Sequence, residues 1–88
     1  MVQIEYDMIV FKEEKTFVAY SPELDVSSCG ETIDQAKRNL KTAVRLFLEE
    51  AEKMKTLDTI LIEAGFEQDM MDNWMPPRIV ATELVGAC

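Results

Sequence analysis

The sequence contains no histidine, and this absence excludes several kinds of active site. A Ser-His-Asp triad, a Cys-His nucleophile pair and a metal site with imidazole ligands all need that side chain. The two cysteines, Cys29 and Cys88, are too few for a disulfide framework or for a zinc site of four thiolates. Cys29 precedes a predicted helix start, but without a histidine or a nearby second cysteine we expect an ordinary packed or half-exposed thiol.

Carboxylates are the chemically active groups that the chain has in abundance, with seventeen Asp and Glu against nine Lys and Arg. Glu5 and Asp7 share one face of a predicted strand. A helix start and a later strand could add Glu31 or Asp34 and Glu83. Such a set could hold the two Mg²⁺ ions of a nuclease, about 4 Å apart. An acidic chain supplies these residues by chance, so we expect a solvated acidic face, with no metal, no cofactor and no enzymatic activity.

The formal net charge of −8 restricts the class of partner. Nucleic acids and anionic membranes are bound by clustered Lys and Arg, so the balance favours a basic partner, or it serves solubility alone. No apolar run approaches the roughly 18 residues of a membrane span, and the acidic, alternating N-terminus is unlike a signal peptide. We expect a cytoplasmic protein, and 88 residues fit a single domain, 1–88.

Alternating apolar residues predict strands in the first third of the chain. One face of the segment 2–11 carries Val2, Ile4, Tyr6, Met8 and Val10. Ile9 and Phe11 interrupt the polar face, which predicts a strand that becomes buried on both faces. The polar run 12–15 predicts a hairpin turn, and the β-branched and aromatic residues of 16–21 predict a second strand. A short third strand is expected over 25–29.

Helical signals follow from Thr32 onward. Thr32 is placed as an N-cap, and Gln35, three residues later, completes a capping box. Apolar residues at i, i+3, i+4 and i+7 then predict an amphipathic helix to about Met54, roughly 33 Å long. A second, shorter helix is predicted over 56–64, before Gly65. The segment 78–85 (RIVATELV) predicts a last strand.

These elements predict an α+β two-layer fold in the order β-β-β-α-α-β. The three-stranded antiparallel meander has the long amphipathic helix on one face, then a short second helix, and a final strand that returns beside the first. The other face of the sheet is expected to be partly bare. In a small protein, such a face or an open edge is usually covered by another copy or by another protein.

Three short motifs carry a family resemblance. They are the turn Pro22-Glu23-Leu24, the cap Gly30-Glu31-Thr32 and the helical run Asn39-Leu40-Lys41. This pattern resembles the HicB-like antitoxin family over about 10–50, nearly half of the chain. The resemblance implies a truncated ribonuclease-H-like sheet with its last strand beside the first. Pro22, Gly30 and Thr32 are expected to determine the fold: Pro22 ends a strand, Gly30 permits a positive φ, and Thr32 caps the helix.

The resemblance also implies a partner. Many members of the family neutralise a small basic ribonuclease toxin, HicA, by covering its RNA-binding surface. The candidate toxin contacts in this chain are Glu5, Asp7, Glu23 and Asp25. Many members also carry a C-terminal DNA-binding segment, and no basic recognition helix follows Glu50 here, so direct nucleic-acid binding is not expected. The alternative is a solitary homo-oligomeric module of the same fold, without a toxin and with another partner or ligand.

An apolar cluster lies in the predicted loop after the second helix. It contains Phe66, Trp74 and Met75, with further methionines. The cluster is either a flap over the chain's own helix or sheet edge, or a contact within a homodimer or larger oligomer, because Trp and Met favour interfaces.

Overall fold

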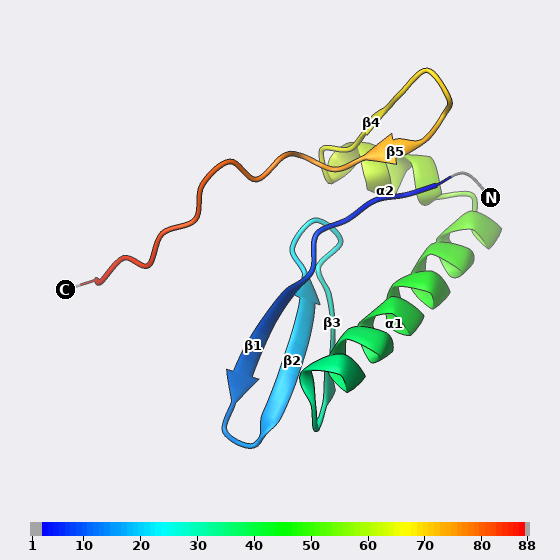
Figure 1. Ribbon diagram of the computed structural model, residues 1–88. Helices are drawn as coiled ribbons and strands as arrows, with labels where there is room; N and C mark the ends of the chain where they lie inside the picture. Colours follow the sequence, from blue (N-terminus) through cyan, green and yellow to red (C-terminus); the bar gives the residue numbers. More distant parts are fainter. Residues whose placement is uncertain (1–2, 88) are drawn as a thin grey trace.

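The computed structural model describes residues 3–87, so Val2, where the first strand was predicted to begin, and Cys88 lie outside it. A three-stranded antiparallel sheet has the order β1-β2-β3 (Figure 1). Its strands are β1 (Ile9–Glu13), β2 (Thr16–Ser21) and β3 (Val26–Gly30). Helix α1 (Ile33–Lys53) follows, then α2 (Leu57–Glu63) and a small antiparallel pair of strands, β4 (Glu67–Gln68) and β5 (Trp74–Met75). The predicted α+β fold is confirmed.

Helix α1 packs against one face of the sheet, mainly over β2 and β3. Its buried residues follow the predicted helical spacing: Ala36, Leu40, Val44, Leu48 and Ala51. They form a core with Ala19 of β2, Leu24, and residues of α2 and the β4–β5 hairpin. Ile33 begins the apolar spacing of this helix in the sequence but is half exposed, because it lies at the first turn, beyond the edge of the core.

Of the two capping-box contacts predicted at the start of α1, one is present, and the other is displaced by one residue. The Gln35 backbone N–H donates to the Thr32 hydroxyl at 3.0 Å. In return, the side-chain carbonyl of Gln35 accepts from the Glu31 backbone N–H at 2.6 Å. The Gln35 N–H, which the helix itself leaves unpaired, therefore has a partner, and the Gln35 side chain joins the residue before the cap to the first turn. Local sequence thus sets the start of α1.

Gly30 has a different role from the predicted one. Within residues 3–87, Gly65 is the glycine with a positive φ (90°), so Gly30 does not need the left-handed region. A Cβ at Gly30 would instead lie 2.6 Å from the Ala36 backbone nitrogen and 2.9 Å from the Gln35 carbonyl carbon. Gly30 is required because the start of α1 approaches the end of β3 too closely for any side chain.

The prediction of a last strand over residues 78–85 is wrong. The structure describes all of these residues, and none of them belongs to a strand. The chain does return beside its first segment, but through Trp74, which forms a parallel bridge with Ile4. The Trp74 N–H donates to the Gln3 carbonyl at 2.9 Å, and the Glu5 N–H donates to the Trp74 carbonyl at 3.1 Å. Pro76, two residues after Trp74, is the next residue that would donate to the first segment, and neither it nor Pro77 has an N–H, so the pairing cannot continue along the chain. Residues 78–87 then run away from the body of the protein (Figure 1).

Candidate functional site

The face of the sheet opposite α1 is the candidate functional site. Residues directly opposite each other on neighbouring strands share a face. Phe11, Val18 and Cys29 form one row across the three strands, and Ile9, Tyr20 and Ser27 form the next. The intervening rows pack toward α1, since Val10 and Phe17 contact the core and Ala19 is fully buried. We call the face formed by the first two rows the open face.

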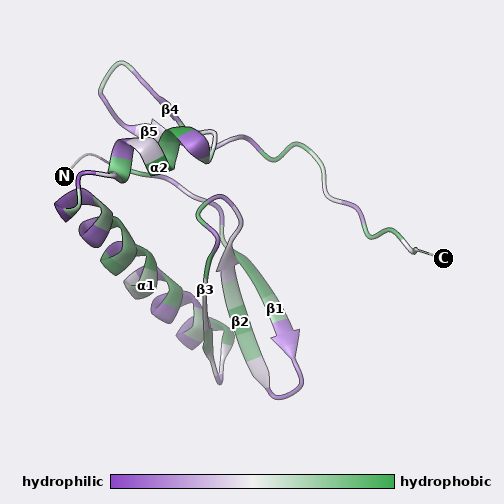
Figure 2. Cartoon of the chain, turned by 180° about the vertical axis from the view of Figure 1, so that it is seen from behind, coloured by the Kyte–Doolittle hydropathy of each residue, from purple (hydrophilic) through white to green (hydrophobic). Residues whose placement is uncertain are grey.

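The centre of the open face is apolar and accessible. The Phe11 side chain is 49% exposed, and Ile9, Val18 and Tyr20 are half-buried. The prediction that the first strand becomes buried on both faces is therefore wrong, because within residues 3–87 no element covers this side of β1. The expectation of a partly bare face is confirmed. Figure 2 shows the hydrophobic residues along β1 and β2 and the polar end of their hairpin.

Carboxylates border the open face at the end away from the hairpin. Ile4, Tyr6, Met8 and Val10 pack toward the core as predicted, and Glu5 and Asp7, which alternate with them, line a common hollow with residues 75–79. Asp25 reaches the same border, because its carboxylate accepts a hydrogen bond from the Tyr20 hydroxyl at 3.0 Å. This hydrogen bond raises the pKa of Tyr20, so the phenol keeps its proton and remains a donor. Three of the four predicted contacts thus lie on one border.

The fourth predicted contact, Glu23, already has partners within the chain. Its two carboxylate oxygens accept from the Asp7 N–H at 3.2 and 3.0 Å, and one also accepts from the Ser21 hydroxyl at 3.4 Å. Partial burial, then a hydrogen bond to the Asp7 side chain, raise the pKa of Glu23. Glu23 joins the turn after β2 to the first segment, so its first role is structural.

Two hollows adjoin the open face. One, of about 580 Å³, lies at the hairpin end and is lined by Glu13, Glu14, Thr16, Val18 and Cys29. The other, of about 350 Å³, lies between the first segment, with Glu5 and Asp7, and residues 75–79. Both combine apolar and acidic lining residues, and the second also includes Arg78. Carboxylates therefore lie beyond both ends of the apolar open face.

The apolar cluster after α2 is mostly part of the chain's own core. Phe66 and Trp74 are both buried, each 4% exposed, which corrects their assignment as contacts for a second copy. The physical reason is the bridge to Ile4, which holds Trp74 between the first segment and the end of the helical layer. Met75 is 39% exposed and remains accessible.

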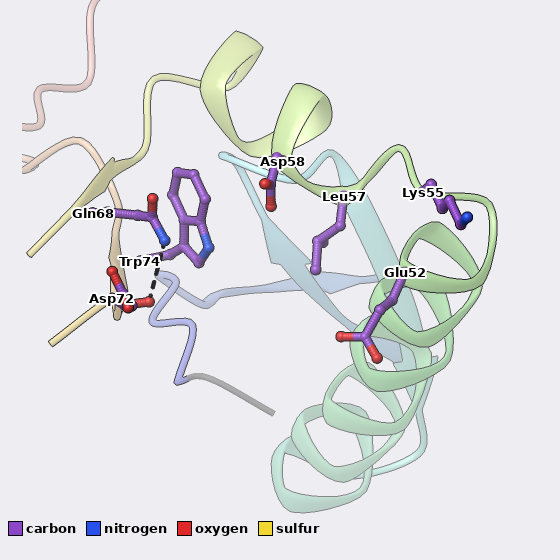
Figure 3. A pocket seen from close by; sticks show the side chains of 7 residues that line it. All are labelled: Glu52, Lys55, Leu57, Asp58, Gln68, Asp72 and Trp74. Atoms are coloured by element: carbon purple, nitrogen blue, oxygen red, sulfur yellow. Dashed lines mark hydrogen bonds between the residues drawn. The ribbon is translucent and has the colours of Figure 1, made fainter.

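A further hollow, of about 580 Å³, opens beside Trp74 (Figure 3). Its polar lining residues are Glu52, Lys55, Asp58, Gln68 and Asp72. The Gln68 amide donates to the Asp72 backbone carbonyl at 3.4 Å, which closes the β4–β5 hairpin. The charged side chains are exposed, and the hollow has the character of a solvated surface rather than of an active site.

Residues 3–87 contain no group of three or more His, Cys, Asp or Glu residues placed to hold a metal ion. Of the carboxylates considered for a nuclease, Glu83 belongs to the segment 78–87, which forms no strand and runs away from the body of the protein (Figure 1). In the same part of the chain, no helix has the length and apolar character needed to cross a bilayer.

The accessible apolar residues of the open face were not recognised as a site from sequence. The signal was present in Ile9 and Phe11, which interrupt the polar face of the first strand, but they were interpreted as core residues. Comparisons with protein-family models, with curated proteins and with solved structures found no match to this chain. The family resemblance therefore depends on its own residues: the turn at Pro22, the Gly30-Glu31-Thr32 cap and the helical run that follows.

Proposed function

We propose that this chain is a HicB-like antitoxin that binds a small basic ribonuclease toxin of the HicA type and covers its RNA-binding surface. The observation that carries the proposal is the open face, where the exposed Phe11 lies between two borders of carboxylates. A surface that binds RNA must present Lys and Arg to the phosphates. An acidic protein face with an apolar centre is complementary to such a surface.

The two parts of the open face would contribute differently to binding. Aromatic side chains near the centre of an interface dominate affinity, because their burial excludes water. Phe11 and Tyr20 have this position in the face. Charges at the border mainly accelerate association and select the partner, and their effect weakens with salt. Glu5, Asp7 and Asp25 have that position.

An antitoxin of this kind acts by occlusion and needs no catalytic group or cofactor. The net charge of −8 makes direct binding to RNA or DNA unfavourable, so the contact would be with the toxin protein alone. The same mechanism assigns the protein to the cytoplasm, where the RNA substrate of such a toxin is found.

The test is co-expression with the small basic protein encoded beside this chain, scored by growth and by the dissociation constant of the purified pair. Phe11→Ala should weaken binding by about 10- to 100-fold. Leu46→Ala is the matched control, because Leu46 is similarly exposed (55%) but lies on α1, away from the open face. It should bind like the wild type.

Raising the salt concentration from 50 to 300 mM should slow association of the pair while changing dissociation little. Two results contradict the proposal. One is the absence of any small basic protein both among the neighbouring genes and in a pull-down; the other is a Phe11→Ala variant that neutralises the toxin as well as the wild type.

A further inference from the structure

Residues 78–85, which we call the arm, are extended and expose large apolar side chains. Val80 is 87% exposed and Leu84 is 101% exposed, and Ile79 and Val85 are also exposed. The arm leaves the body of the protein and pairs with no strand among residues 3–87 (Figures 1 and 2). Its β-branched residues favour a strand. The arm thus has the composition of a strand and no partner strand among the described residues 3–87.

The outer edge of β1 is the part of the sheet with which the arm could pair. β1 pairs with β2 on one side, and along its other side residues 3–87 provide no strand. Such an edge presents unpaired N–H and C=O groups at every second residue. α1 packs mainly over β2 and β3, so Val10 of β1 is only half-buried. A strand added here would cover backbone groups and apolar surface together.

The exit of the arm directs it away from its own β1. Pro76 and Pro77 each restrict φ to about −65°. Pro77 also packs closely on Gly65, where an added Cβ would lie 2.9 Å from the proline ring. The turn after α2 therefore supports a fixed starting direction, and the arm continues away from the sheet (Figure 1). A short, stiff connection that prevents a strand from folding back favours its exchange between copies.

The charges permit this contact between two acidic copies. The arm has one positive residue, Arg78, and one negative residue, Glu83. β1 likewise carries Lys12 and Glu13. Each strand is therefore neutral, so their pairing avoids the repulsion expected between two chains of net charge −8. At about 3.3 Å per residue, the eight-residue arm spans about 26 Å, enough to cover the five residues of β1.

We propose that the arm of one copy pairs with the outer edge of β1 in a second copy, reciprocally, to form a strand-exchanged dimer. The strand that the sequence predicts beside the first is then supplied by the partner. This interface involves the edge of the sheet and leaves the open face accessible, so it does not depend on the proposed antitoxin role.

The first test compares Leu84→Lys with Met70→Lys by sedimentation of the full chain over a range of concentrations. Met70 is the matched control, because both side chains are fully exposed within one chain and Met70 lies outside the arm. The wild type should dimerise. Leu84→Lys should raise the dimer dissociation constant at least about 100-fold, since each dimer buries Leu84 twice. Met70→Lys should leave it unchanged, and circular dichroism should show the same helical content in all three proteins.

The second test distinguishes exchange between copies from folding back. Two single-cysteine proteins, Phe11→Cys and Val80→Cys, are made in a Cys29→Ser, Cys88→Ser background and mixed under oxidising conditions. A chain that carries both substitutions in the same background is oxidised separately. Exchange predicts a disulfide between the two chains. Three results overturn the proposal: a monomeric wild type at millimolar concentration, a dimer that Leu84→Lys does not weaken, and a chain with both cysteines that cross-links only within itself.

Discussion

Substitutions of Glu23 can show whether this residue stabilises the fold, contacts the toxin, or does both. Its carboxylate accepts hydrogen bonds from the Asp7 N–H and from the hydroxyl of Ser21. The Ser21 side chain is fully buried, so its hydroxyl has no access to water. Glu23→Ala would leave both donors without this partner.

The cost of Glu23→Ala follows from those two donors. Leaving a buried hydrogen-bonding group unsatisfied costs about 1–3 kcal/mol. In a domain of this size, each kcal/mol lowers the melting temperature by roughly 4–8 °C. We therefore expect Glu23→Ala to melt about 5–20 °C below the wild type, measured by circular dichroism in parallel with urea denaturation.

Glu23→Gln should behave differently, because the amide oxygen can still accept from the Asp7 N–H. The amide nitrogen can also donate to the Asp7 carboxylate, which a charged Glu23 cannot do. Since burial and the Asp7 side chain raise the pKa of Glu23, the folded state binds this proton more tightly than the unfolded chain does.

The sign of the pH dependence follows. The contribution of Glu23 to wild-type stability is greatest at low pH, and it is lost as the pH rises from the ordinary glutamate pKa through the raised folded pKa. Glu23→Gln removes this loss. We expect the variant to be at least as stable as the wild type at pH 7, with a flatter stability profile above the ordinary glutamate pKa.

One result would refute this reasoning: a Glu23→Gln protein as unstable as Glu23→Ala, which would mean that the charge itself is needed for folding. Binding to the toxin gives a separate outcome. If Glu23→Gln folds normally but binds more weakly, Glu23 is also a charged contact, as its place in the predicted set requires.

The remaining predictions concern close packing. Gly30→Ala should lower the free energy of unfolding by about 1–3 kcal/mol, because its Cβ would meet the backbone of α1. Gly86→Ala, which has no atom within 4 Å of the added Cβ, should match the wild type in the same urea titration. Trp74→Ala should cost about 3–5 kcal/mol as a core truncation, whereas Met71→Ala, at an exposed position of the same hairpin, should be neutral. Equal stabilities within either pair would contradict the packing described.

Elements governed by local signals were predicted well. The bounds of β2 agree with the prediction, and α1 begins after Thr32 and ends at Lys53, next to the predicted Met54. The reason is physical: a capping box, a 3.6-residue apolar period and a proline after a strand act on neighbouring residues. The face of the first segment that carries Ile4 and Tyr6 was also predicted, because alternation determines which side chains share a side.

The sequence did not predict which segments of the chain lie beside one another. The β-branched residues of 78–85 favour an extended backbone but do not specify the strand beside it, and the position beside the first segment is taken by Trp74 instead. In the same way, Ile9 and Phe11 are apolar enough for a core, and only the layer arrangement leaves their face uncovered. Gly30 is a further example. The sequence indicated that a glycine is needed at this position, but only the close approach of α1 explains the reason.

The sequence by itself determined the acidic charge, the absence of histidine chemistry, the long helix with its N-cap and the order of the elements as far as α2. Those properties depend on composition or on contacts between near neighbours. Only the tertiary structure decided that Glu23 joins the turn to the first segment, that Trp74 belongs to the core, and that the open face and the edge of β1 remain accessible. These outcomes depend on which segments, distant in sequence, come into contact. The packing of the whole fold and the direction of the chain determine those contacts.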